Sequence, residues 1–145
     1  MINFCIIVLD YSMESLSEKA NQSLNSARLL VKESYYSSTV NRSYYACFQY
    51  LMHILFEKLK KDPDEFYSEV NNGKNGTHTW ASKLIGIELA KKDLQDYKWY
   101  QKEIPALREK RVQADYYATV ILPADGHESI NKAVAIMNLL AKHFK

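Results

Sequence analysis

The chain of 145 residues is 47% hydrophobic, which is sufficient for one domain with one continuous core. Its net charge of +2 is far below that of proteins that hold duplex nucleic acid through phosphate neutralisation alone, so any nucleic-acid contact must be local. Four glycines and three prolines are too few for the turns of a β-sandwich or barrel and leave space for helices of about 20 residues. The sequence therefore predicts an all-α protein.

Residues 1–12 stand apart from the rest of the chain. Their apolar stretch, residues 4–9, is too short to cross a membrane and has neither a preceding basic residue nor a small-residue cleavage site. The segment is either a short extended piece that packs on the bundle or on a neighbour, or an upstream extension of a protein whose natural start is Met13. We favour the extension, because helical periodicity begins only after Met13. We expect a single helical domain over residues 13–145.

Apolar residues at helical spacing predict a first helix over residues 13–33. A Ser/Tyr-rich break follows, and a second helix is predicted over residues 40–59. This helix carries Tyr45, Met52 and Phe56 beside its main apolar stripe, so more of its circumference is apolar than one core contact requires. It is predicted to be a central or interface helix, which favours a homodimer or a heteromer.

The second half of the chain predicts a loop and then further helices. Residues 62–77 contain proline, asparagine and glycine with little periodicity, which indicates a loop with room for one helical turn. Because proline is tolerated in a first turn but breaks a helix interior, we expect a helix to begin near Ile104, just before Pro105. Four or five helices with short connections favour an antiparallel up-and-down bundle. The helices expected here cover residues 78–92, 104–122 and, capped by Asp125, 126–144.

Arg111 is the most informative residue, because the apolar stripe of its predicted helix places the guanidinium on the core-facing side. An ion there needs a partner, and Asp115 lies one helical turn further on. One interpretation is an internal salt bridge between the two residues that orients the helix. The other is an anion or phosphate site built on Arg111, because a planar guanidinium matches phosphate oxygens.

The second predicted helix carries another polar set, in which Arg42, Gln49 and His53 share one face. Arg42 is the strongest of these, since Asn41 and Tyr45 surround it with hydrogen-bonding groups. The alternative is that Arg42 caps a helix or connects two helices. The many tyrosines suit base stacking, although their helical spacing is also that of core and interface packing.

The remaining polar residues indicate no enzyme class. His78 is typical of a loop next to a helix start, and His127 and His143 of solvated helix positions. Cys5 and Cys47 are widely separated, with no CxxC or His/Cys cluster, so neither a disulfide framework nor a zinc site is indicated and a reducing cytoplasm is expected. GxSxG, Walker and HExxH motifs are missing. No metal, cofactor or membrane contact is therefore predicted.

Two segments together become recognisable: V-N-R-S-Y-Y-A-C-F at residues 40–48, preceded by A-R-L-L at residues 27–30, and R-V-Q-A-D-Y at residues 111–116. They resemble the prokaryotic HEPN-domain family, in its branch with an N-R-x-Y-Y-A-x-F helix and an R-x-x-A-D-Y helix. The likeness extends over about residues 13–144. It implies a bundle of four or five helices that often dimerises and is frequently encoded beside a minimal nucleotidyltransferase as a toxin–antitoxin pair.

The resemblance also implies a chemistry, from which this sequence departs. Many HEPN proteins are metal-independent endoribonucleases with an R-x4-6-H motif, in which the arginine holds phosphate and the histidine assists the 2′-hydroxyl. Arg111 matches the arginine, but residues 116–118 read Tyr, Tyr and Ala, so the histidine is missing. Tyrosine, with a reference pKa of about 10, is a poor general base near neutrality.

We expect a HEPN-like protein that binds nucleotide or RNA, or acts through a nucleotidyltransferase partner, without efficient catalysis. The first alternative is a metal-independent endoribonuclease toxin that uses Arg111 with Tyr116, or with His53 or His78 brought in by folding. The second is a purely structural protein-interaction module. The residues expected to bind nucleotide or RNA are Arg111, Asp115, Tyr116, Arg42, Asn41 and Tyr45.

Overall fold

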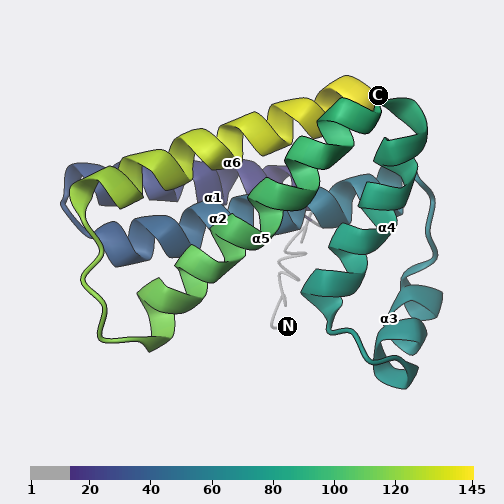
Figure 1. Ribbon diagram of the computed structural model, residues 1–145, viewed down its shortest axis with the longest axis horizontal. Helices are drawn as coiled ribbons and strands as arrows, with labels where there is room; N and C mark the ends of the chain where they lie inside the picture. The colour runs from purple at the N-terminus through teal and green to yellow at the C-terminus, as the bar shows by residue number, and fades with distance from the viewer. Residues whose placement is uncertain (1–13) are drawn as a thin grey trace, which may run out of the picture.

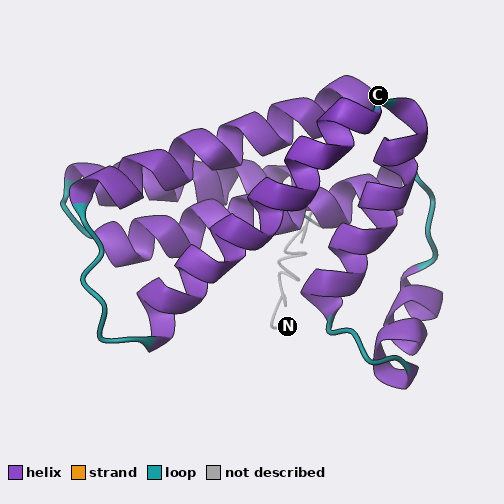
Figure 2. Ribbon diagram, in the orientation of Figure 1, coloured by secondary structure: helices purple, strands orange, loops and turns teal. Residues whose placement is uncertain are grey.

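The fold is built from helices alone over residues 14–145, the part of the chain that the computed structural model describes (Figures 1 and 2). The prediction for residues 1–12 lies outside the described residues. A five-residue π-helical stretch, Ile54–Lys58, continues α2. The predicted all-α class is confirmed, although the described residues form six α-helices where four or five were expected. They are α1 (Leu16–Lys32), α2 (Tyr36–His53), α3 (Pro63–Asn72), α4 (Thr77–Lys92), α5 (Leu94–Tyr116) and α6 (Pro123–His143).

The helix α2 occupies the centre of the bundle, where it contacts α1, α4, α5 and α6. Its apolar stripe is buried, including Val40, Cys47 and Leu51. The helix therefore needs apolar neighbours on several sides at once, which explains why its apolar surface is wider than one stripe. The prediction of a central helix is confirmed. Its neighbour α1 begins at a capping box, in which Ser15 and Glu18 each bond the other's backbone N–H.

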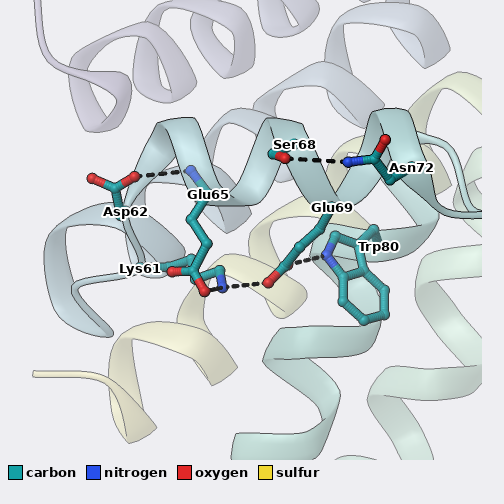
Figure 3. Close-up of polar contacts among 7 residues, drawn as sticks. All are labelled: Lys61, Asp62, Glu65, Ser68, Glu69, Asn72 and Trp80. Carbon is teal, nitrogen blue, oxygen red and sulfur yellow. Dashed lines mark hydrogen bonds and ion pairs between the residues drawn. The ribbon is translucent and has the colours of Figure 1, made fainter.

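The helix α3 occupies residues that were expected to form a loop, so that prediction is wrong. Asp62 caps its first turn, where the carboxylate accepts a hydrogen bond of 2.8 Å from the Glu65 N–H, and Pro63 stands at the tolerated first position. Phe66 is fully buried, and Glu69 accepts hydrogen bonds from Lys61 and from the Trp80 indole of α4 (Figure 3). Tertiary contacts thus stabilise a helix that the weak periodicity did not indicate.

The helix α5 begins ten residues before the expected start near Ile104, and it contains Pro105 in its interior. Asp93 caps it, since its carboxylate accepts hydrogen bonds of 2.9 Å from the N–H groups of Gln95 and Asp96. Tyr100 and Ile104 are buried on either side of the helical turn that the proline weakens. Their packing offsets the cost of the proline. The helix also ends earlier than expected, at Tyr116, and residues 117–122 form the connection to α6.

The helix α6 begins at Pro123, three residues before its expected start, so Asp125 lies within its first turn and not at the cap. Its carboxylate accepts a hydrogen bond of 2.9 Å from the Leu122 N–H. The expectation of a solvated His143 is wrong. Only 11% of that side chain is exposed, and its Nε2 lies 2.7 Å from the Asp96 carboxylate of α5, which Lys142 also contacts. These bonds lower the pKa of Asp96 and fasten the end of α6 to the start of α5. None of the helices described here is long and apolar enough to span a membrane.

The position of Pro105 gives a stability prediction. Alanine would restore the N–H that the Gln101 carbonyl lacks and would remove the ring clash with that carbonyl. An interior proline destabilises a helix by about 3 kcal/mol, but it also stiffens the unfolded chain, which stabilises the folded state by up to ~1 kcal/mol. Pro105→Ala should therefore raise the free energy of unfolding by about 2 kcal/mol. Urea denaturation followed by circular dichroism measures this change. Unchanged or lower stability would contradict it.

Candidate functional site

Arg111 is a buried cation surrounded by aromatic rings. It lies on α5 with 7% of its surface exposed, facing the central helix. Its guanidinium carbon is 5.1 Å from the ring centroid of Tyr44, 5.7 Å from that of Tyr45 and 6.0 Å from that of Tyr116. Each distance is within the range of a cation–π contact. The aromatic faces thus compensate part of the cost of burying the charge.

Asp115 is the acidic partner of Arg111, as one of the two interpretations of the sequence expected. One of its carboxylate oxygens lies 3.6 Å from Nη1 of Arg111. The two groups form an ion pair, but this distance is too long for a hydrogen bond. The buried Nε has no partner, and Arg111 donates no hydrogen bond to any residue that the structure describes. A guanidinium carries five N–H donors. Arg111 therefore keeps donors that a ligand could satisfy.

Asn41 connects this ion pair to Arg42, so the two predicted sequence motifs meet in space. Its amide nitrogen donates to both oxygens of Asp115, at 3.1 and 2.9 Å. Its amide oxygen accepts from Nε and Nη2 of Arg42, at 2.9 and 2.7 Å. The Arg42 guanidinium also lies 5.3 Å from the Tyr45 ring centroid. We refer to Asn41, Arg42, Tyr45, Arg111, Asp115 and Tyr116 as the Arg111 cluster.

His78 lies beside the cluster although the sequence places it 33 residues before Arg111. Its Nδ1 is 2.7 Å from the Tyr44 hydroxyl, and its ring stacks on Phe48 with a centroid separation of 3.9 Å. Burial, and then the charges of Arg108 and Arg111, lower the pKa of His78 to about 4. Burial raises the pKa of Tyr44 to about 12. Both groups are therefore neutral near neutral pH.

Arg108 is a further cation, which the sequence analysis did not single out. It lies nearly one turn before Arg111, and its Nη1 donates a hydrogen bond of 2.9 Å to the Thr79 hydroxyl of α4. No carboxylate among residues 14–145 pairs with Arg108 or with Arg42. Of the three guanidinium groups, only that of Arg111 pairs with a carboxylate within these residues, that of Asp115. This surplus of positive charge favours an anion.

Other candidates lie away from the cluster or at its edge. His53 stacks near Tyr50 at the far end of α2, and burial lowers its pKa. Gln49 bonds the Ser23 hydroxyl of α1 instead of joining Arg42. Tyr116 is 73% exposed even though its ring lies over Arg111. Of the predicted set, the structure thus brings together Asn41, Arg42, Tyr45, Arg111, Asp115 and Tyr116, and leaves Gln49 and His53 outside.

Comparison with known families supports the resemblance that the motifs indicated. Residues 13–66 match the HEPN domain, which confirms the likeness over the part of the chain that contains the N-R-x-Y-Y-A helix. The second motif, at residues 111–116, lies beyond the matched region. Comparison with curated proteins and with solved structures gives no match.

The lowered pKa of His78 predicts a pH dependence of stability. In the unfolded chain an imidazole takes up a proton as the pH falls through about 6.5, whereas folded His78 stays neutral down to a pH of about 4. Between these values the unfolded state binds more protons, so stability is lost as the pH falls. His78→Gln should reduce this loss. Urea denaturation at pH 7 and at pH 5 tests it, with His127→Gln, an exposed histidine of α6, as the control that keeps the wild-type dependence.

Proposed function

We propose that the Arg111 cluster binds the phosphate of a nucleotide or of RNA, without efficient catalysis. The observation that carries this proposal is the charge surplus of the cluster, in which the two guanidinium groups of Arg111 and Arg42 face one carboxylate, that of Asp115. Arg111 has unused N–H donors, and Arg42 is only partly buried and presents a second guanidinium to the same region. Charge-assisted hydrogen bonds from such groups are the usual means of holding phosphate.

Each member of the cluster has a role in this proposal. Arg111 and Arg42 contact phosphate oxygens, and Asp115 with Asn41 orients the two guanidinium groups. Tyr116 is exposed and Tyr45 is partly buried, so both rings can stack on a base next to the phosphate. The competing interpretation is that this ion pair within α5 has only a structural role, in which its contacts with Asn41, Tyr44 and Tyr45 fasten α5 to α2. In that case the cluster contributes stability, and the protein is a structural interaction module.

The same end of the bundle offers a surface for a protein partner. Tyr35, Tyr117 and Val120 are exposed there, on the α1–α2 turn and on the connection to α6, and a shallow hollow lies between these two segments. Exposed aromatic and apolar side chains are typical of interfaces. We propose this surface for the homodimer or for a minimal nucleotidyltransferase partner. A nucleotidyltransferase gene beside the coding gene would support the second.

RNA binding tests the phosphate proposal. We expect Arg42→Ala and Arg111→Lys each to weaken the retention of a mixed structured RNA, without divalent metal, by about tenfold, because each removes charge-assisted hydrogen bonds. Lysine keeps the charge of Arg111 but loses the planar fork. Filter binding at two salt concentrations measures the affinity.

The control is Arg28→Ala, which removes an exposed arginine of α1 whose guanidinium donates a hydrogen bond to Asn25. It should bind RNA as the wild type does. Circular dichroism and size exclusion establish that each variant is folded. Normal binding by folded Arg42→Ala together with unfolding of the Arg111 variants would overturn the proposal in favour of the structural role. Wild-type protein that retains no RNA at either salt concentration would shift the weight to a protein partner.

A second candidate, a metal-independent endoribonuclease, is favoured by the position of His78 beside Tyr44 and Arg111. The histidine that is missing after Arg111 in this sequence would then be supplied by α4. It would remove the proton of a 2′-hydroxyl, whose oxygen attacks phosphorus and expels the 5′-oxygen to leave a 2′,3′-cyclic phosphate. A base with a pKa of about 4 is weak near neutrality, so this reaction should be slow.

RNA cleavage distinguishes this candidate. If His78 is the base, His78→Gln and Arg111→Lys should each reduce metal-free cleavage at least about tenfold. The product should carry a cyclic phosphate, detected by mass spectrometry. His127→Gln is the matched control and should cleave as the wild type does. Retention of RNA without cleavage supports binding alone, whereas cleavage that is unchanged in His78→Gln excludes His78 as the base.

A further inference from the structure

A second hollow lies between α4 and α5, separate from the Arg111 cluster. Its volume is about 640 Å³, within the range of roughly 300–1,000 Å³ that is usual for small-molecule sites. The two helices are joined by a short connection, and α2 forms the floor through Tyr44 and Leu51. The helices diverge from this connection in Figure 1.

Two backbone features shape this cleft. Gly86 brings α4 close to α5, since a Cβ there would lie 3.2 Å from a ring atom of Tyr97 and 3.6 Å from one of Tyr100. Pro105 on the opposite wall has no N–H, so the carbonyl of Gln101 lacks its usual helical donor. The cleft thus has a close-packed aromatic end.

The walls are largely apolar and the charged groups are few. Ile104 and Val112 line one side, and Ile87, which is 45% exposed, lines the other near the mouth. An exposed isoleucine over an apolar cleft is apolar surface that a ligand can remove from water. Apolar burial would therefore supply most of the binding energy.

The charges at the mouth determine the sign of the ligand. Arg108 and Lys83 are the cations of the lining, and Glu109 is its single acid. Glu109 stands at the edge, because it also lines a separate hollow with Gln113 and Tyr117. Arg108 uses one N–H on Thr79 and has no carboxylate partner in residues 14–145. His78, the remaining titratable ring in the lining besides the tyrosines, is neutral near pH 7.

We propose that this cleft binds a small apolar anion, with its aromatic or acyl body against Ile87, Tyr97 and Val112 and its carboxylate, sulfonate or phosphate on Arg108. The site is distinct from the Arg111 cluster, because Tyr44 lies between them. The Arg111 guanidinium lies over the Tyr44 ring, and Tyr44 also forms part of the cleft floor.

The test uses two dyes that differ in charge. Anilinonaphthalene sulfonate is an apolar anion, and phenylnaphthylamine is its uncharged parent. Fluorescence titration of the full chain should show one saturable site for each, and decanoate, an acyl carboxylate, should displace both. Arg108→Leu should weaken the sulfonate about tenfold and leave the uncharged dye within about twofold, because only the first makes a charge-assisted contact.

Three further variants locate the site. Ile87→Glu places a carboxylate at the mouth and should abolish binding of the sulfonate, whereas Leu29→Glu, the same change at an exposed leucine of α1, should leave it unchanged. Arg42→Ala, in the Arg111 cluster, should also leave it unchanged. The proposal is overturned if no saturable site exists or if Ile87→Glu binds normally. It is also overturned if both dyes bind without preference for the anion, which would indicate a groove for apolar side chains of a protein.

Discussion

The burial of the Arg111 guanidinium constrains the packing of α5 on α2. An ion out of water costs several kcal/mol unless its surroundings compensate it. Here three tyrosine rings and one carboxylate do so, and the carboxylate is 3.6 Å away, too far to accept a hydrogen bond. The compensation is therefore mainly electrostatic, and it requires α2 to hold Tyr44 and Tyr45 at fixed distances. The N–H donors stay unused, so the interaction that stabilises the helix pair also preserves a capacity to bind an anion.

The central position of α2 decides which distant residues meet. Asn41 contacts Asp115 of α5, while Tyr44, nearly one turn later, reaches both Arg111 of α5 and His78 of α4. A helix with contacts on several sides can join segments that are far apart in the chain. The surplus of positive charge near Tyr44 is thus a product of tertiary packing, since the chain as a whole carries a net charge of only +2.

The predictable features were those that local spacing encodes. The apolar stripe around Arg111 indicated both its burial and its pairing with Asp115, and the two motifs indicated that Asn41 and Arg42 belong with them. Spacing did not distinguish His78 from His53 as the histidine that folding brings near Arg111, and it did not single out Arg108, because the partners of both residues lie on other helices. The same limit explains the errors over α3 and Pro105. In both places the packing of a buried side chain, Phe66 in α3 and Tyr100 in α5, contributes more to helix stability than the local preference for a loop or the proline removes.

Tyr44 also bears on whether the cluster and the cleft act independently. Its ring faces Arg111, its hydroxyl bonds His78, and both Tyr44 and His78 line the cleft. A ligand in the cleft affects the cluster only if its affinity differs between two arrangements of these side chains. Burial, and then the charges of Arg108 and Arg111, lower the pKa of His78, so an anion on Arg108 would offset part of this lowering and favour protonation of the imidazole. The coupling would then be electrostatic and would pass through the imidazole, without movement of a helix.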